Sequence, residues 1–426
     1  MLDIKFIRQN PQIVKEGCRN KQVKVDIDRL LEVDKKRLEI LLALEDMRAQ
    51  KNKASKKIST AKNEKEKRKI ILEMQELDKN SDRLNKNLKE IQKEFDSLIF
   101  QIPNLPQEDT PVGKNEQDNI VLKEVGERPK FDFKIKDYLE IAENLDLIDI
   151  KRASKVAGTR FGYLKREAVL IEFSLIKLAF DKVIKEGFIP ILPPVMLKEE
   201  MARGTGYFEA ADKEEAYYLS KDNLYLVGTA EQSIAAMHAE EIFEEKDLPR
   251  RYVAFSTCFR REAGAYGKDT KGILRVHQFD KVEMFSFCQP EKSREEHNFF
   301  LSLEEKLMQS LKIPYRVIHI CTGDLGRPAA AKYDIEAWLP SENRYRETHS
   351  TSNCTDFQSR RLNIRYRNSK TRKLEFVHTV NGTAFSQRPI LAIIENYQQK
   401  DGGIKVPEVL EKYLPLRPKM IPFLKR

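Results

Sequence analysis

The chain of 426 residues is long enough for two or three domains with a substantial apolar core. Hydrophobic residues make up 40% of it, yet no apolar run approaches the ~20 residues of a membrane-spanning helix. The five cysteines include no C-x-x-C pair and the six histidines show no ligand spacing, so we expect neither disulfides nor a zinc site. The N-terminus lacks an apolar secretory signal, so we expect a cytoplasmic protein with no membrane partner.

The formal net charge of +10 is distributed unevenly along the sequence. Residues 51–69 carry nine Lys/Arg residues against two Asp/Glu residues, so much of the excess positive charge lies in one short stretch. Such a concentration is typical of a surface that binds a polyanion, for example a nucleic acid. The charge count leaves open the alternative of a merely solvated charged face.

Residues 27–98 carry apolar side chains at alternating spacings of four and three, and neither glycine nor proline occurs from residue 21 to 102. The apolar positions form one regular series in the second half. In the first half they form two series, of which the second is shifted in register against the first. Two such halves joined near residues 62–67 predict a long antiparallel coiled-coil hairpin with the basic stretch toward its tip. A dimerising coiled coil would explain the heptads equally well, but it would not explain the basic tip.

Three prolines and no periodicity mark residues 102–119 as a boundary. We therefore expect a helical domain at 1–105, a linker at 106–128 and a second domain at 129–426. The second domain mixes helical stretches with β-rich runs but lacks regular βα alternation, which predicts an α+β fold on an antiparallel sheet flanked by helices. It contains neither a P-loop nor a G-x-G-x-x-G opening a helix, which argues against both kinds of nucleotide site.

One stretch of this domain, CFRREAGAYGKDTKGILRVHQF at 258–279, places much charge between two β-rich runs. Arg260 and Glu262 alternate along the first run and so share one face of a strand, while Phe279 lies on the returning strand. A guanidinium suits a phosphate, a carboxylate accepts a hydrogen bond from an exocyclic amine, and an aromatic ring stacks on a purine. Together these groups suggest a site for ATP, and the alternative is a surface hairpin with ordinary ion pairs.

This F-R-x-E, loop, R-x-x-x-F pattern resembles motif 2 of the class II aminoacyl-tRNA synthetases. Residues 187–194 resemble motif 1, which forms the dimer interface of that class, and residues 381–398 place an arginine before an apolar helix, as motif 3 does. Within the class, the chain resembles the seryl-tRNA synthetases over essentially its whole length. The further blocks that carry this resemblance are the N-terminal arm, GTAEQ at 228–232, HQFDKVEMF at 277–285, ETHSTSNCTDFQSRR at 347–361 and ENYQQKDGGIKVPEVL at 395–410.

The resemblance implies ATP-dependent attachment of L-serine to serine tRNA through a seryl-adenylate, with ATP and Mg²⁺ as the required cofactors. Charging of a selenocysteine tRNA stays open. It also implies a homodimer and an N-terminal arm that grips the long variable arm of serine tRNA. The arm residues expected to contact tRNA are Lys53, Lys56, Lys57 and Lys62.

The site residues that the resemblance implies are given by their positions in this sequence. The catalytic positions are Arg260, Glu347 and Arg388. The positions for serine are Thr229, Ala230, Glu231, Arg260, Glu283 and Thr383, of which Glu283 and Thr383 would bind the hydroxyl. The positions for ATP are Arg260, Arg261, Glu262, Phe279, Glu347, Thr348, His349, Ser350 and Arg388, and the Mg²⁺ ligands would be Glu347 and Ser350.

Two positions depart from the commonest family pattern. Ala384 stands where motif 3 often has a glycine, which removes backbone freedom, and His349 stands where a serine is frequent. For each implied site residue the alternative is a structural role, such as an ion pair within the sheet.

Three other functions compete with this interpretation. A related ligase that charges a carrier protein would lack the long arm. A catalytically silent RNA-binding protein on the same fold would be favoured by loss of Arg260, Glu283 or Arg388, and all three are present. A coiled-coil scaffold would leave the C-terminal 300 or so residues unexplained.

Overall fold

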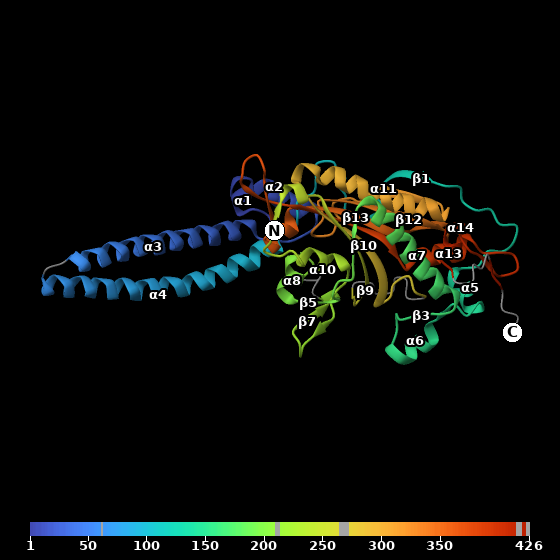
Figure 1. Ribbon diagram of the computed structural model, residues 1–426, viewed down its shortest axis with the longest axis horizontal. Helices are drawn as coiled ribbons and strands as arrows, with labels where there is room; N and C mark the ends of the chain where they lie inside the picture. The colour runs from blue at the N-terminus through green and yellow to red at the C-terminus, as the bar shows by residue number, and fades with distance from the viewer. Residues whose placement is uncertain (61–62, 209–213, 264–271, 415–419, 423–426) are drawn as a thin grey trace. The chain divides into compact units, whose positions relative to one another are not determined.

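The computed structural model describes the chain except for residues 61–62, 209–213, 264–271, 415–419 and 423–426. The chain forms two compact units (Figure 1). The smaller unit comprises residues 2–19 and 23–103, and the larger unit comprises Met1, residues 20–22 and residues 104–426. Among the helices of the described ranges, none has both the length and the apolar character needed to cross a membrane.

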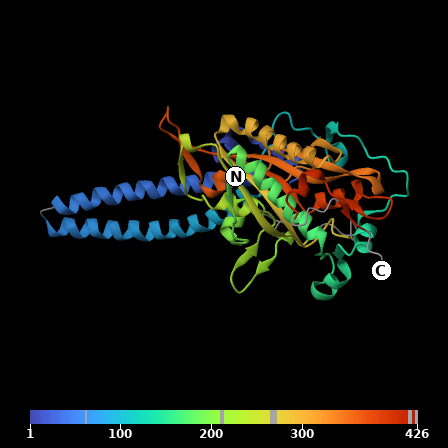
Figure 2. The ribbon, with the colours of Figure 1, turned by 45° about the vertical axis from the view of Figure 1, so that its right-hand side comes forward.

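The smaller unit is built around two long helices. Helices α1 (Ile4–Gln9) and α2 (Pro11–Asn20) precede α3 (Ile27–Thr60) and α4 (Glu64–Gln101), and α3 and α4 run side by side in both views (Figures 1 and 2). Ion pairs such as Arg29 with Glu94, at 2.7 Å, and Lys51 with Asp78 link the two helices. The predicted antiparallel helical hairpin is confirmed. Lys62 lies outside the described residues.

The larger unit is organised by an eight-stranded sheet in the order β1-β11-β12-β13-β16-β10-β9-β4, in which only the β4–β9 pair is parallel. This confirms the predicted α+β fold on an antiparallel sheet. In sequence order the strands are β1 (Ile120–Val125), β4 (Ile189–Ile191), β9 (Arg250–Phe259), β10 (Gln278–Cys288), β11 (Tyr315–His319), β12 (Ala331–Leu339), β13 (Arg344–Thr355) and β16 (His378–Ser386).

Shorter elements surround the sheet. The α-helices in the described residues of this unit are α5 (Tyr138–Asn144), α6 (Ile150–Ala157), α7 (Glu167–Val183), α8 (Glu199–Gly204), α10 (Ala230–Ala236), α11 (Ser293–Leu311), α12 (Phe357–Leu362), α13 (Arg388–Asn396) and α14 (Glu408–Glu411). The remaining strands are β2 (Ile148–Asp149), β3 (Tyr163–Leu164), β5 (Met196–Lys198), β6 (Tyr218–Leu219), β7 (Leu224–Leu226), β8 (Ile242–Glu244), β14 (Arg365–Arg367), β15 (Leu374–Phe376), β17 (Ile404–Lys405) and β18 (Met420–Ile421).

Strand β10 shows how the two faces of the sheet differ. Val282 and Met284 point to one face, where they join an apolar core with α7, α11 and α13. Phe285 and Phe287 point to the other face and pack with residues of α10 and α12. Because side chains alternate along a strand, the residues of β10 before Phe285 on this second face are free to line a cavity.

A β-bulge in β13 sets which side chains share that second face. Opposite Ile335 and Glu336 of β12, strand β13 contains one extra residue, Thr348. In a regular strand, residues three apart point to opposite faces. The extra residue shifts the alternation, so that Glu347 and Ser350 both face the cavity described below.

A second bulge lies in β16. Here the extra residue is Ala384, opposite Val282 and Glu283 of β10. The bulge places Thr383 and Ser386 on the cavity face, and it leaves Thr383 directly across from Glu283. The φ angle of Ala384 is not positive, so the loss of a glycine at this position does not strain the backbone.

The segment 106–128 is not a linker between the two units. Its strand β1 pairs antiparallel with β11 and forms one edge of the large sheet. The segment therefore belongs to the larger unit, because β1 satisfies backbone groups of β11 that would otherwise be an open edge. The boundary between the units falls at Pro103 and Asn104, close to the predicted end of the helical domain at residue 105.

Candidate active site

The second face of the large sheet holds a cavity of about 640 Å³. This volume lies within the range of roughly 300–1,000 Å³ that small-molecule sites occupy. The cavity brings together residues that are far apart in the sequence and come from β9, β10, β13, β16 and the start of α10. The predicted site residues that line it are Thr229, Glu231, Arg260, Glu262, Phe279, Glu283, Glu347, Thr348, Ser350, Thr383 and Arg388.

At the start of α10, the carboxylate of Glu231 is buried and held by hydrogen bonds. Tyr207 donates its hydroxyl to Oε2 at 2.9 Å, and Gln358 donates Nε2 to Oε1 at 2.7 Å. Thr229 caps the helix and accepts a hydrogen bond from the backbone N–H of Glu231. Burial raises the pKa of Glu231, although the hydrogen bonds from Gln358 and Tyr207 oppose the rise. A cation bound here would therefore favour the ionised carboxylate.

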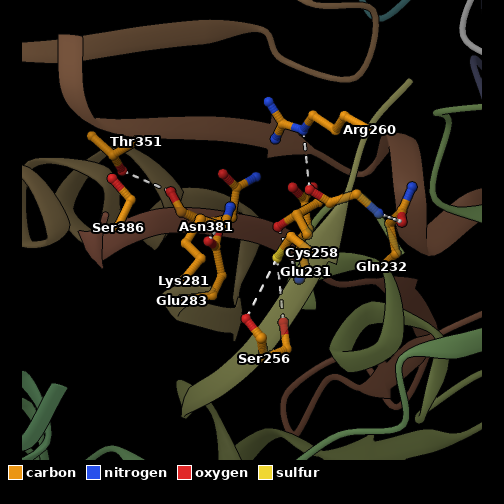
Figure 3. Close-up of polar contacts among 12 residues, drawn as sticks. Glu231, Gln232, Ser256, Cys258, Arg260, Lys281, Glu283, Thr351, Asn381 and Ser386 are labelled. Carbon is orange, nitrogen blue, oxygen red and sulfur yellow. Dashed lines mark hydrogen bonds and ion pairs between the residues drawn. The ribbon is translucent and has the colours of Figure 1, made fainter. Parts of the chain in front are cut away.

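Farther along the cavity, Glu283 of β10 lies across from Thr383 of β16. Burial raises the pKa of Glu283 to about 7, with Lys281 opposing the rise and Glu231 adding to it. The ammonium of Lys281 pairs with the Glu283 carboxylate, and the two side chains lie next to each other in Figure 3. The pair offers a small polar ligand a carboxylate and a hydroxyl at the same point.

Arg260 directly follows β9 and points into the cavity (Figure 3). Its Nε donates to the carbonyl of Gly228 at 3.2 Å, and its guanidinium carbon lies 5.2 Å from the ring centroid of Phe279. Arg275 and Glu262, both also in the lining, form an ion pair at 3.3 Å. An anionic group in the cavity would meet Arg260, with the aromatic ring of Phe279 beside it.

A second arginine reaches the cavity from the start of α13. Arg388 contacts the Oε1 of Glu347 at 3.0 Å and donates to the backbone carbonyl of the same residue. Burial would raise the pKa of Glu347, but Arg388 and Lys332 outweigh it and hold the pKa well below its ordinary value. Burial raises the pKa of the neighbouring Asp334, although Lys332 opposes the rise. The Glu347 carboxylate is therefore held in its ionised form.

The donor set around Glu347 fits Mg²⁺. The bulge at Thr348 directs the Glu347 carboxylate and the Ser350 hydroxyl to the same wall, and both are hard oxygen donors. Across the described part of the chain there is no group of three or more His, Cys, Asp or Glu residues that could hold a metal ion. Two protein ligands completed by phosphate and water oxygens match the usual way in which Mg²⁺ is bound with a nucleotide.

Three of the predicted site residues lie outside the lining. Ala230 is fully buried and packs in the apolar cluster under α10. Arg261 directs its guanidinium over the ring of Tyr217, with 5.6 Å between the guanidinium carbon and the ring centroid. His349 points to the opposite face of β13 because of the bulge, where burial lowers its pKa to about 3. The centroid of its ring lies 5.5 Å from that of Phe385. The histidine that replaces the more frequent serine at this position therefore packs in the core.

The cavity also contains residues that the sequence patterns did not single out. Lys281 could have been found, since it lies between Phe279 and Glu283 on the same face of β10. Lys332 and Tyr207 carry no comparable signal. They reach the site from β12 and from the segment after α8, and only the tertiary fold brings them near the predicted residues.

Two family models match the chain. Residues 1–106 match the seryl-tRNA synthetase N-terminal domain, and residues 217–397 match the tRNA synthetase class II core domain (G, H, P, S and T). Among curated proteins, the serine–tRNA ligase of Dictyoglomus turgidum is 45% identical, over 98% of this chain and 100% of that protein.

Solved structures agree with the sequence relatives. A seryl-tRNA synthetase from Pyrococcus horikoshii, complexed with ATP, has a TM-score of 0.91 at 39% identity, and the match covers 100% of both chains. A cytoplasmic serine–tRNA ligase from Naegleria fowleri, in complex with AMP, has a TM-score of 0.87 at 34% identity over 100% of this chain and 99% of that chain. With fold, cavity and sequence all in agreement, the chain belongs to the seryl-tRNA synthetase family.

Proposed function

We propose that the cavity carries out both steps by which a serine–tRNA ligase charges its tRNA. The carboxylate of serine attacks the α-phosphorus of ATP, and pyrophosphate leaves as seryl-adenylate forms. A ribose hydroxyl at the 3′ end of the tRNA then attacks the seryl carbonyl and releases AMP. The observation that carries this proposal is one cavity whose lining brings the buried carboxylates of Glu231 and Glu283 together with the guanidinium groups of Arg260 and Arg388.

The buried carboxylates of Glu231 and Glu283 suit serine. We assign the amino group of serine to Glu231 and Thr229, since a buried carboxylate at the cavity wall attracts an ammonium. We assign the side-chain hydroxyl to Glu283 and Thr383, which face each other across two strands. The hydroxyl would donate to the carboxylate and accept from the threonine, so both of its hydrogen-bonding roles are used.

The arginines of the lining suit the nucleotide. We assign the α-phosphate and the serine carboxylate to Arg260, and the adenine ring to the space between Phe279 and Arg388, with Glu262 accepting from the exocyclic amine. The serine carboxylate is already a nucleophile and needs no general base. The chain therefore contributes mainly by holding the reactants in line and by stabilising the charge that develops on phosphate.

We assign a magnesium ion to Glu347 and Ser350. Bound there, the ion would neutralise phosphate charge and help pyrophosphate to leave. The ion pair between Arg388 and Glu347 holds that carboxylate at the cavity wall in its ionised form. Lys332, close to the same carboxylate, adds positive charge where the triphosphate would lie.

The proposed phosphate contact is tested by Arg260→Ala. Removing a donor aimed at developing charge typically lowers a rate by roughly 10²–10³-fold, and we expect a loss of at least this size in serine-dependent exchange of pyrophosphate into ATP. Arg294→Ala is the matched control, because its guanidinium pairs with Asp109 at the surface. Exchange by the Arg260 variant within tenfold of wild type would contradict the assignment.

The proposed hydroxyl contact is tested by Thr383→Val, which keeps the shape of the side chain and removes its hydroxyl. A site built on buried hydrogen bonds rejects an analogue that lacks them by as much as roughly 10⁴-fold. We expect wild type to prefer serine over alanine strongly in pyrophosphate exchange. The variant should lose serine activity and leave alanine activity nearly unchanged. A variant with an unaltered serine-to-alanine ratio would show that Thr383 does not contact the hydroxyl.

We propose that the tip of the α3–α4 hairpin binds tRNA. Lys53, Lys56 and Lys57 near the end of α3 are exposed, in the stretch where nine basic residues face two acidic ones. Several neighbouring charges are internally paired, such as Lys67 with Glu64 at 3.3 Å. The tip nevertheless keeps a large positive excess, and an RNA backbone would supply the opposite charge.

Reversing the charge of Lys53, Lys56 and Lys57 to glutamate should separate the two reaction steps. Pyrophosphate exchange should stay near wild type, because the hairpin contributes no residue to the cavity lining. Aminoacylation should fall through weaker tRNA binding. Each lost phosphate contact should reduce the log–log salt slope of that binding by roughly one unit.

The control for this experiment reverses Lys86, Lys89 and Lys93, which are exposed toward the other end of α4. Wild-type aminoacylation and an unchanged salt slope in the tip variant would show that the hairpin charge does not serve tRNA.

We propose that the chain is a homodimer through β4 and α7. Strand β4 is the last strand of the large sheet, so its outer backbone edge is unpaired in that sheet. Apolar side chains around it are exposed, including Leu192 (79%), Phe173 (62%) and Ile189 (44%). An exposed apolar edge of this kind is typical of a surface that a second protein copy covers.

Sedimentation velocity at micromolar concentration should give a mass near twice 49.7 kDa. The double substitution Phe173→Glu and Leu192→Glu should give monomers, since it places charge in the proposed interface. Val112→Glu, at a position that is also exposed but far along the sequence from β4, is the control and should remain dimeric. A wild-type protein that sediments only at the chain mass would refute the dimer.

A further inference from the structure

A loop, residues 326–329, contributes to the cavity wall. The side chain of a buried lysine donates hydrogen bonds to the backbone of this loop. Lys21 is only 6% exposed. Its ammonium donates to the carbonyl oxygens of Gly326 at 2.8 Å, Arg327 at 3.2 Å and Ala329 at 2.7 Å. An ammonium has three hydrogens, so the side chain has one donor for each of these three acceptors.

Asn104 also donates hydrogen bonds to this loop. Its backbone N–H donates to the carbonyl of Arg327 at 2.9 Å, and its side-chain amide donates to the carbonyl of Pro328, also at 2.9 Å. The same amide reaches the carbonyl of Cys354 at 2.8 Å, which ties the loop to the end of β13. Between them, Lys21 and Asn104 satisfy every backbone carbonyl from residue 326 to residue 329.

The loop needs such donors because it belongs to no helix or strand. Buried backbone carbonyls must find a donor, and for the buried residues Pro328 and Ala329 the side chains of Asn104 and Lys21 supply it in place of the backbone N–H groups of a helix or sheet. Replacing Lys21 with an apolar side chain would remove the donor of the Ala329 carbonyl and one of the two donors of the Gly326 and Arg327 carbonyls, which keep the backbone N–H groups of Ala329 and Asn104. The loop would then shift to reach other donors or water.

The other side of the loop faces the proposed serine site. Gly326, Pro328 and Ala329 contribute to the cavity lining. Pro328 packs against Gly206, where an added Cβ would lie 3.3 Å from the proline Cγ. Gly206 precedes Tyr207, whose hydroxyl donates to Glu231. A shift of the loop would therefore reach the carboxylate assigned to the amino group of serine.

We propose that Lys21 and Asn104 are positioning residues for serine activation. They fix residues 326–329 as a rigid wall that keeps Tyr207 and Glu231 in place, and neither touches substrate. The inference rests on the proposed serine site, and it adds two residues that the sequence motifs of the catalytic part do not contain. One comes before the long helical hairpin and the other comes directly after it.

The test is steady-state pyrophosphate exchange by the full-length chain, with Lys21→Met and Asn104→Ala assayed singly and together. Each single variant should raise the KM for serine at least tenfold and change the KM for ATP less than threefold, because Pro328 of the loop packs against Gly206, which precedes the Tyr207 that bonds Glu231. The double variant should be affected less than the product of the two single effects, because both residues act on one loop.

Lys24→Met is the control, since Lys24 is exposed and lies three residues away from Lys21. Thermal unfolding of each variant shows whether it is folded, and Asn104→Ala alone carries the test if Lys21→Met does not fold. Serine KM values within twofold of wild type, or equal rises for serine and ATP, would overturn the inference. A wild-type chain without serine-dependent exchange would instead overturn the proposed function.

Discussion

The cavity depends on one constraint: an ionised side chain leaves water only where an opposite charge or hydrogen-bond donors meet it. Glu347 satisfies this constraint with Arg388. Lys281 satisfies it for Glu283 only in part, because burial still raises the pKa of Glu283 to about 7. Glu231 accepts hydrogen bonds from Tyr207 and Gln358, which oppose only part of the rise that burial causes in its pKa. An incoming ammonium would favour the ionised form of such a partly compensated carboxylate.

This distribution of charge requires a sheet whose two faces differ. The apolar face packs on α7, α11 and α13 and supplies most of the core, so the other face can carry polar groups without losing the fold. Bulges at Thr348 and Ala384 then adjust the alternation of two strands, so that residues three apart share the polar face. Bulges are frequent beside active sites because they re-aim side chains at the cost of a few ladder hydrogen bonds.

Much of this architecture could be predicted from the sequence, because it rests on periodic patterns. The heptads specify the α3–α4 hairpin. The expected strand alternation of Arg260 and Glu262 was wrong, because β9 ends at Phe259 and Glu262 has a positive φ of 50°, although both residues line the cavity. The contact between Glu283 and Thr383 could not be derived in this way, because the residues are 100 positions apart and their register depends on a bulge. That pair was expected only from the family resemblance. His349 was expected at the cavity for the same reason, and the bulge turns it into the core instead.

The hydrogen bonds from Lys21 and Asn104 to residues 326–329 could not be predicted from a pattern of side chains in the sequence, since their acceptors are backbone carbonyls. They do have a topological consequence. The chain leaves the larger unit after residue 22 and re-enters it at residue 104, and residues on both sides of this gap bond the same carbonyl oxygen, that of Arg327. The helical hairpin is therefore an insertion whose two ends meet at one spot on the host domain. Helices α1 and α2 belong to the same unit and pair with α3 through Arg8 with Asp34 and Lys15 with Asp28, so a shortened or lengthened hairpin should keep the base of α3 and change only the part beyond it.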